Sequence, residues 1–110
     1  MFNRKMVELN AAAHDACELL GALANERRMV ILCQLLDGER NVNELCEDVG
    51  MSQSTVSQQL AKLRDLKLVE TRRDGKQIYY RLASEEVERV LTTLYGIYCD
   101  PETRVKRRVA

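Results

Sequence analysis

The apolar residues of this chain recur at two different spacings along the sequence. Steps of three and four residues, the period of an amphipathic helix, cover most of the chain. They predict helices over residues 6–23, 25–36, 42–49 and 52–66, and a last helix from Ser84 to a stop at Asp100-Pro101. Capping residues stand at the expected helix starts and glycines at two of the ends, namely Asn25, Asn41 with Glu44, Ser52, Gly38 and Gly50.

Before the last helix the period changes to two, which is the spacing of a strand. Residues 68–73 and 77–82 are β-prone runs joined around Asp74-Gly75, a strong hairpin signal. A helix, a short helix, a glycine and another helix, followed by a basic hairpin, are the order of a winged helix-turn-helix. The expected fold is therefore mostly α with a two-stranded β-hairpin, in one domain over residues 1–110. In that fold the second helix of the pair enters the major groove and the hairpin lies against phosphates.

The composition argues against two classes of protein. No stretch approaches the roughly 18–20 apolar residues of a membrane span, and the N-terminus carries no apolar secretion signal. We therefore expect a cytoplasmic protein without a membrane partner. Four cysteines in such a protein indicate reduced thiols, metal ligands or redox chemistry rather than structural disulfides.

The net charge is zero, but the charges are unevenly distributed. Residues 8–50 hold nine acidic and three basic side chains, whereas residues 62–81 hold seven basic and three acidic ones. A basic tail over residues 101–110 adds four more positive charges. A neutral protein with such a basic segment can present a positive face to a polyanion.

The outward face of the fourth predicted helix is polar but almost uncharged. Amides and hydroxyls both donate to and accept from base edges, so this face is a candidate for reading DNA. Its candidate DNA-binding residues are Gln53, Ser54, Thr55, Ser57, Gln58, Gln59 and Lys62. At the hairpin tip we expect phosphate contacts from Arg72, Arg73 and Lys76. Each feature alone is more typical of a solvated surface, and it is their order along the chain that favours DNA.

Four motifs in this order resemble the ArsR/SmtB family of bacterial repressors. They are Leu-Ala-Asn-Glu-Arg-Arg over 23–28, Asn-Glu-Leu-Cys over 43–46, Ser-Gln-Ser-Thr-Val-Ser-Gln-Gln-Leu over 52–60 and Arg-Asp-Gly-Lys-Gln-Ile-Tyr-Tyr over 73–80. The resemblance covers nearly the whole chain. It implies a homodimer formed by the first and last helices, on a pseudo-palindromic operator of double-stranded DNA. Gln59 stands where many members carry histidine, a departure that concerns base preference and not docking.

The metal-sensing branches of that family are matched only in part. Cys46 corresponds to the first cysteine of the arsenic-sensing Cys-x-Cys pair, but Asp48 replaces the second. The zinc-sensing branch has Asp and His ligands along the last helix, whereas the single histidine here is His14 on the first. Zinc requires about four ligands, so we expect no metal site and no cofactor. Cys46 lies on an apolar stripe and is expected to pack, and Cys17 to fill the core or a dimer interface.

Cys33 and Cys99 resemble the dithiol pair of the SqrR/BigR/HlyU branch. In that branch persulfides join the two thiols through a polysulfide bridge, and the DNA is released. The pairing of Cys33 with Cys99 comes from the resemblance and not from their spacing. It implies a redox-sensing repressor whose inducer is a persulfide or polysulfide and whose targets are sulfide-detoxification genes.

Three alternatives remain open from the residues. One is a metal- or arsenite-responsive repressor with a rearranged site drawn from Cys17, Cys33, Cys46 and Cys99. Another is a small thiol enzyme such as a sulfurtransferase. No glycine-rich anion loop or Cys/His pair surrounds a cysteine, and His14 has no evident partner, so we expect no enzyme. The third is an adaptor with an inactive DNA-binding face, which the intact basic hairpin disfavours.

Overall fold

Five α-helices and a small antiparallel sheet make up residues 4–99, the part of the chain that the computed structural model describes. The elements are α1 (Arg4–Leu23), α2 (Glu26–Gln34), the 3-10 turn η1 (Leu35–Asp37), β1 (Arg40–Asn41), α3 (Val42–Val49), α4 (Gln53–Asp65), β2 (Val69–Asp74), β3 (Gln77–Leu82) and α5 (Glu85–Tyr98). The predicted helices and hairpin are thus confirmed, with η1 in place of the last turn of the second helix. The predicted stop at Asp100-Pro101 and the basic tail lie outside the described residues.

Side-chain caps explain where these helices begin. Asn25, Ser52 and Ser84 each accept a hydrogen bond from the backbone N–H three residues further on. Asn41 and Glu44 form the predicted capping box, with distances of 2.8 and 2.9 Å between donor and acceptor. These bonds satisfy N–H groups that a helix start otherwise leaves without a partner.

The sheet has three strands and not the two that the sequence predicts. The order is β1-β3-β2, because Arg40 pairs with Tyr80 and Asn41 with Tyr79. Two residues are too few to produce an alternating pattern, so β1 leaves no signal in the sequence. Its position has a consequence, since Asn41 both ends β1 and caps α3. The hairpin is therefore tied, through β1, to the start of α3.

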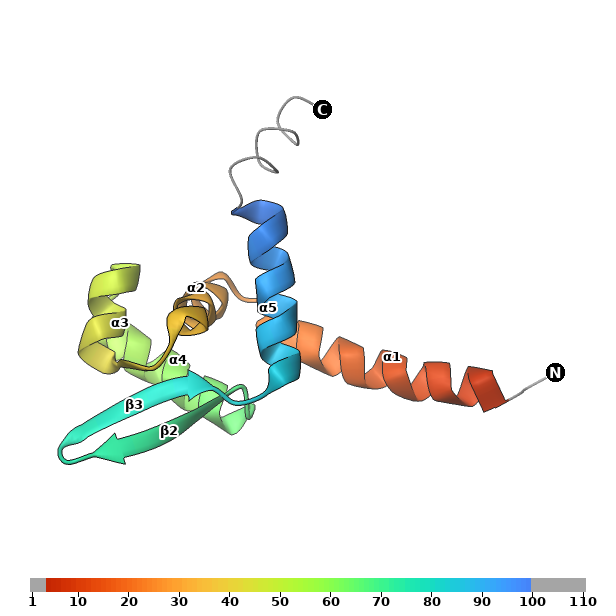
Figure 1. Cartoon of the computed structure of the whole chain (residues 1–110), viewed down its shortest axis with the longest axis horizontal. Coiled ribbons are helices and arrows are strands. Elements are labelled where there is room, and N and C mark those ends of the chain that lie inside the picture. The colour runs from red at the N-terminus through yellow and green to blue at the C-terminus, as the bar shows by residue number, and fades with distance from the viewer. Residues whose placement is uncertain (1–3, 100–110) are drawn as a thin grey trace, which may run out of the picture.

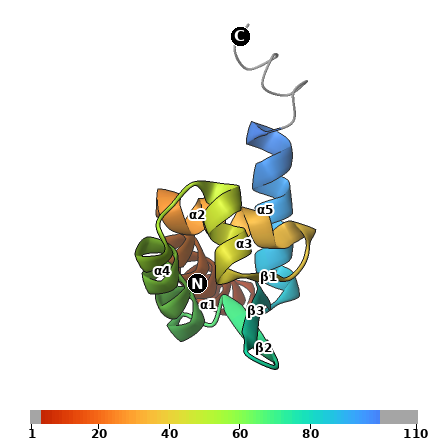
Figure 2. The ribbon, with the colours of Figure 1, turned by 90° about the vertical axis from the view of Figure 1, so that its left-hand side faces the viewer.

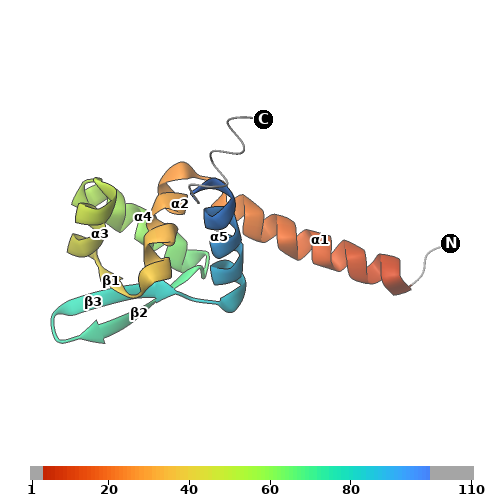
Figure 3. The same ribbon diagram turned by 45° about the horizontal axis from the view of Figure 1, so that its top comes forward.

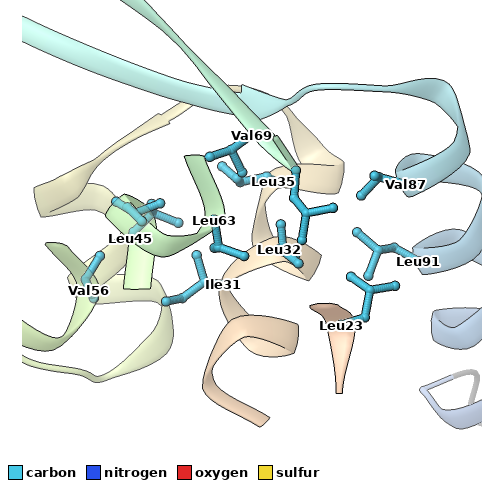
Figure 4. Packing of buried hydrophobic residues seen from close by; sticks show 12 residues of the cluster. Leu23, Ile31, Leu32, Leu35, Leu45, Val56, Leu63, Val69, Val87 and Leu91 are labelled. Atoms are coloured by element: carbon cyan, nitrogen blue, oxygen red, sulfur yellow. The ribbon is translucent and has the colours of Figure 1, made fainter. Parts of the chain in front are cut away.

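One cluster of buried hydrophobic side chains joins the elements (Figure 4). Ile31 and Leu32 of α2 and Leu45 of α3 pack against the inward stripe of α4, while Val87 and Leu91 bring in α5. The buried members are Leu23, Ile31, Leu32, Leu35, Leu45, Val56, Leu60, Leu63, Leu68, Val69, Val87 and Leu91. Burial of each such side chain contributes about 1.5–3 kcal/mol. This packing fixes α4 against α2 and α3, and so decides which face of α4 is turned outward.

Two helices extend beyond this packed body. α1 projects from it as a long arm, and the last turns of α5 rise above it (Figure 1). The side chains of residues 5–18 are all exposed. The Cα radius of gyration is 16.7 Å, compared with about 13 Å for a compact domain of this length. Apolar side chains are exposed on both helices, among them Met6, Val7, Leu9, Leu20, Tyr95, Ile97 and Tyr98.

Within residues 4–99, no helix combines the length and the apolar character needed to cross a lipid bilayer.

Candidate functional site

The helix pair predicted to dock on DNA is α3 and α4, joined by a connection of three residues. Gly50, at a φ of 67°, ends α3 in the left-handed conformation that glycine adopts at little cost, and Ser52 then caps α4. Figure 2 looks at this side of the body, where α3, α4 and the hairpin face the viewer and α1 runs away behind them.

The predicted DNA-reading face of α4 is mostly exposed, as expected. Successive residues of a helix are about 100° apart, so Ser54 and Gln58 lie roughly opposite the buried stripe of Val56, Leu60 and Leu63. Thr55 is half-buried, and its hydroxyl accepts a hydrogen bond from Ser52 at 3.0 Å. The predicted residues with exposed side chains are Gln53, Ser54, Ser57, Gln58 and Lys62.

Gln59 does not lie on this outward face, which corrects the predicted orientation of its side chain, while its contact with DNA stays a prediction. Its side chain is half-buried, and its Oε1 is buried without a hydrogen-bond partner among the described residues. The reason is helical geometry, because Gln59 stands one turn from Val56 and one turn from Leu63, both of which are buried. The polarity of the residue predicted an outward side chain, but its position on the helix places it at the edge of the core.

The tip of the hairpin carries Arg73 and Lys76. Gly75 and Lys76 form the two-residue loop between β2 and β3, and Gly75 adopts a φ of 63°. The Arg73 Nε donates to the Gly75 carbonyl oxygen at 3.1 Å, which holds that side chain over the loop. Both basic side chains are exposed, and no ion pair with either is found in residues 4–99.

Arg72 lies away from the tip, contrary to the sequence prediction. It stands opposite Tyr79 within the strand pair, and its guanidinium binds the carboxylate of Glu39 with a shortest N–O distance of 3.0 Å. The hydrogen bond from Arg72 is the largest cause of a lowered pKa for Glu39. Sequence reasoning missed Glu39, because it stands 33 residues from Arg72 and belongs to no motif.

Cys33 and Cys99 lie on two helices that pack against each other. Cys33 belongs to α2, is half-buried and packs against the core, whereas Cys99 is exposed at the C-cap of α5. Figure 3 shows α2 and α5 side by side, as their contacts require. Burial raises the pKa of the Cys33 thiol, and the nearby Cys99 charge raises it further. The thiols of these two residues are therefore within range of each other's charge.

The other two cysteines occupy different surroundings. Cys46 is partly buried against the core, so the prediction that it packs is confirmed. Cys17 is exposed on α1, so the expectation that it fills the core of this chain is wrong. A dimer interface remains the alternative predicted for Cys17.

His14 has a partner that the sequence did not reveal. Its Nε2 lies 3.3 Å from the Glu18 Oε1, one helical turn further along α1. Ligand atoms of His14, Asp15 and Glu18 lie within 4.8 Å of one another, all on exposed side chains, and no cysteine belongs to this group.

The raised pKa of Cys33 predicts how fast this thiol reacts at different pH values. Only the thiolate attacks an alkylating reagent, so the reaction rate of Cys33 should rise with a midpoint above the ordinary thiol range. In Cys99→Ser the midpoint should move down, because the neighbouring charge is gone, yet it should stay raised because burial is the larger cause. Iodoacetamide labelling followed by peptide mass spectrometry measures both midpoints. An unchanged midpoint in Cys99→Ser would contradict the proximity of the two thiols.

Comparisons with known proteins agree with this geometry. Residues 25–71 match the family described as "Bacterial regulatory protein, arsR family". The chain is 39% identical over 95 residues to the biofilm growth-associated repressor of Xylella fastidiosa, covering 86% of this chain and 83% of that one. It is 45% identical over 97 residues to the transcriptional activator HlyU of Vibrio cholerae, covering 88% of each.

Solved structures show the same similarity. Reduced HlyU from Vibrio cholerae superposes with a TM-score of 0.78 at 44% identity, over 84% of this chain and 98% of that one. A homodimeric winged helix-turn-helix DNA-binding domain from Mycobacterium bovis gives 0.66 at 37% identity, over 88% and 86%. The named relatives are transcriptional regulators and not enzymes. This chain therefore belongs to the ArsR family, as a DNA-binding transcriptional regulator with a winged helix-turn-helix fold.

Proposed function

We propose that this regulator is a repressor that releases its operator when reactive sulfur joins Cys33 to Cys99. The observation that carries the proposal is the placement of these two thiols on α2 and at the end of α5, within range of each other's charge. Cys99 is exposed and open to a sulfur donor, while Cys33 is half-buried. A relative at 44% identity is described in its reduced form, which supports thiols as the functional groups.

The chemistry needs a persulfide, RSSH, and no other oxidant. A thiolate of the pair attacks the outer sulfur of one persulfide, takes that sulfur atom and releases RSH. The second thiol then closes a trisulfide, and the two electrons released in this step reduce another persulfide to RSH and hydrogen sulfide. A direct disulfide requires Cα atoms within about 7 Å, so a wider pair favours a bridge with inserted sulfur.

A second copy of this chain completes the DNA-binding unit in this proposal. Exposed apolar side chains on α1 and α5, including Leu9, Leu20 and Tyr98, are the surface expected of an interface. A structural neighbour at 37% identity is described as homodimeric. A dimer would place two recognition helices on half-sites about 34 Å apart. Bridging α2 to α5 would change the angle between those helices, because α5 belongs to both the sensor and the interface.

Operator binding under different inducers tests the proposal. Fluorescence anisotropy of labelled operator DNA should show release after treatment with a low-molecular-weight persulfide and rebinding after reduction. Zinc and arsenite should leave the complex intact. Release by arsenite or zinc with no response to persulfide would overturn the thiol-bridge mechanism in favour of a metal-responsive repressor.

Lys76 is expected to contact a DNA phosphate. Its exposed ammonium stands in the hairpin loop without an ion-pair partner among residues 4–99. Lys76→Ala should weaken binding to operator and random DNA alike, and should reduce the slope of log affinity against log salt by about one. Titrations across several salt concentrations measure that slope. Lys76→Arg keeps the charge and should keep the slope, whereas an unchanged slope in Lys76→Ala would place the loop away from the DNA backbone.

A further inference from the structure

We propose that Glu39 is a positioning residue for DNA binding, and that it acts by holding Arg72 in an ion pair on the surface of the sheet, as a brace between two strands. In this proposal Arg72 supports the hairpin, and the contacts between the hairpin and DNA phosphates are made by Arg73 and Lys76. The inference rests on the proposed function, in which the hairpin lies against the DNA backbone.

The contact between Glu39 and Arg72 involves the Nε and Nη2 atoms of the guanidinium. The Arg72 Nε donates to both carboxylate oxygens, at 3.0 and 3.1 Å, and its Nη2 lies 3.0 Å from Oε1. The Cζ atom lies 4.9 Å from the centre of the Tyr79 ring, within the range of a cation–π interaction. Glu39 and Tyr79 together fix the direction of this side chain, and Glu39 engages its Nε and Nη2 donors.

The two ends of this contact come from opposite edges of the sheet. Arg72 belongs to β2, one edge strand, and Glu39 directly precedes β1, the other. Tyr79 belongs to β3 in the centre, opposite both Arg72 and Asn41. A two-stranded hairpin is marginally stable by itself. The brace therefore holds β2 across the whole width of the sheet and sets the direction in which the hairpin loop projects.

The surrounding charges separate the hairpin into two faces. Alternate residues of a strand point to opposite faces, so Arg72 lies on one face and Arg73 on the other. On the side of Arg72, the Arg81 Nε binds Glu70 at 2.7 Å, and Asp74 lies 4.0 Å from the Arg72 Nη1. Counting Glu39, that group holds three acidic and two basic side chains, which gives no attraction for phosphate. Arg73 and Lys76 lack such acidic partners in the described part of the chain.

A double-mutant cycle with salt titrations tests the brace. Glu39→Gln and Arg72→Gln should each weaken operator binding about two- to fivefold, the range typical of a partly exposed ion pair. The double variant should bind no more weakly than either single variant. All three should keep the wild-type salt slope, because no phosphate contact is lost, while Lys76→Ala reduces it by about one.

Three results would each overturn the brace. One is a slope reduced by about one in Arg72→Gln together with tighter binding in Glu39→Gln, which would make Arg72 a phosphate contact and Glu39 its competitor. The second is losses that add in the double variant, and the third is no loss of operator binding in either single variant. Persulfide-induced release is measured on the same variants. Cys33 and Cys99 are intact in these variants. If persulfide still releases the operator but the double-mutant cycle fails, only the brace is refuted. If persulfide does not release the operator from the wild type, the sensing mechanism is refuted.

Discussion

Cys33→Ser and Cys99→Ser are each expected to bind operator DNA almost as the wild type does, and to lose its release by persulfide. Neither residue lies on α4 or the hairpin, so the DNA-facing surface is unchanged. The bridge needs both sulfur atoms, and one remaining thiol cannot link α2 to α5. In the wild type, the treatment should lower operator affinity by roughly 5–150-fold, the range of a typical coupling between two sites. Anisotropy titrations before and after treatment measure this difference.

The remaining cysteines serve as matched controls for this prediction. Cys17→Ser and Cys46→Ser should still respond, with Cys46→Ser less stable because it places a hydroxyl against the core. The treated wild type should gain mass in whole sulfur atoms and lose two free thiols, and a reductant should reverse both changes. Loss of the response in Cys46→Ser but not in Cys99→Ser would place the sensor on α3 and restore the arsenite-responsive alternative.

Gln58→Ala is expected to reduce operator affinity selectively. The side chain is exposed and lies roughly opposite the buried stripe of α4, and a glutamine amide can form two hydrogen bonds to adenine. Each lost base contact should cost about 1–3 kcal/mol, and the proposed homodimer would carry two copies of the substitution. Affinity for random DNA should stay near the wild-type value, because phosphate contacts carry that binding.

Gln59→Ala is the matched control, since it removes the same amide from the same helix. The Gln59 Oε1 is buried at the edge of the core, so this change should leave the ratio of operator to random-DNA affinity nearly intact. Competition titrations with both DNAs give the ratio for each variant. An equal loss on operator and random DNA in Gln58→Ala would show that Gln58 does not read a base.

Local features were predictable from the sequence, whereas contacts across the fold were not. The capping box of Asn41 and Glu44 and the turn around Gly75 depend on residues a few positions apart, so the sequence contains the whole signal. The contact between Glu39 and Arg72 depends on how β1 enters the sheet, and two residues of strand produce no pattern. Burial of Gln59 likewise depends on how α4 packs, which polarity alone does not reveal.

The proposed sensing pair falls between these cases. The residues themselves offered four cysteines and no reason to pair two of them, and resemblance to a family supplied the pair. The packing of α2 against α5 adds a physical reason, because it brings the charges of Cys33 and Cys99 within range of each other. Whether the pair senses sulfur stays a prediction for the thiol variants to decide.

Because α1 forms a projecting arm, the folding of this helix depends on the concentration of the protein. Only the end of α1 reaches the core, through Leu23 with Leu19 and Ala22, while residues 5–18 lie exposed. A helical segment of that length without packing is marginally stable in water. In the proposed homodimer the second copy supplies the missing contacts, so ordering of the arm follows mass action. Dilution would then unfold the arm before it disturbs the core. Operator occupancy would therefore depend on the concentration of the regulator as well as on the chemical state of its thiols.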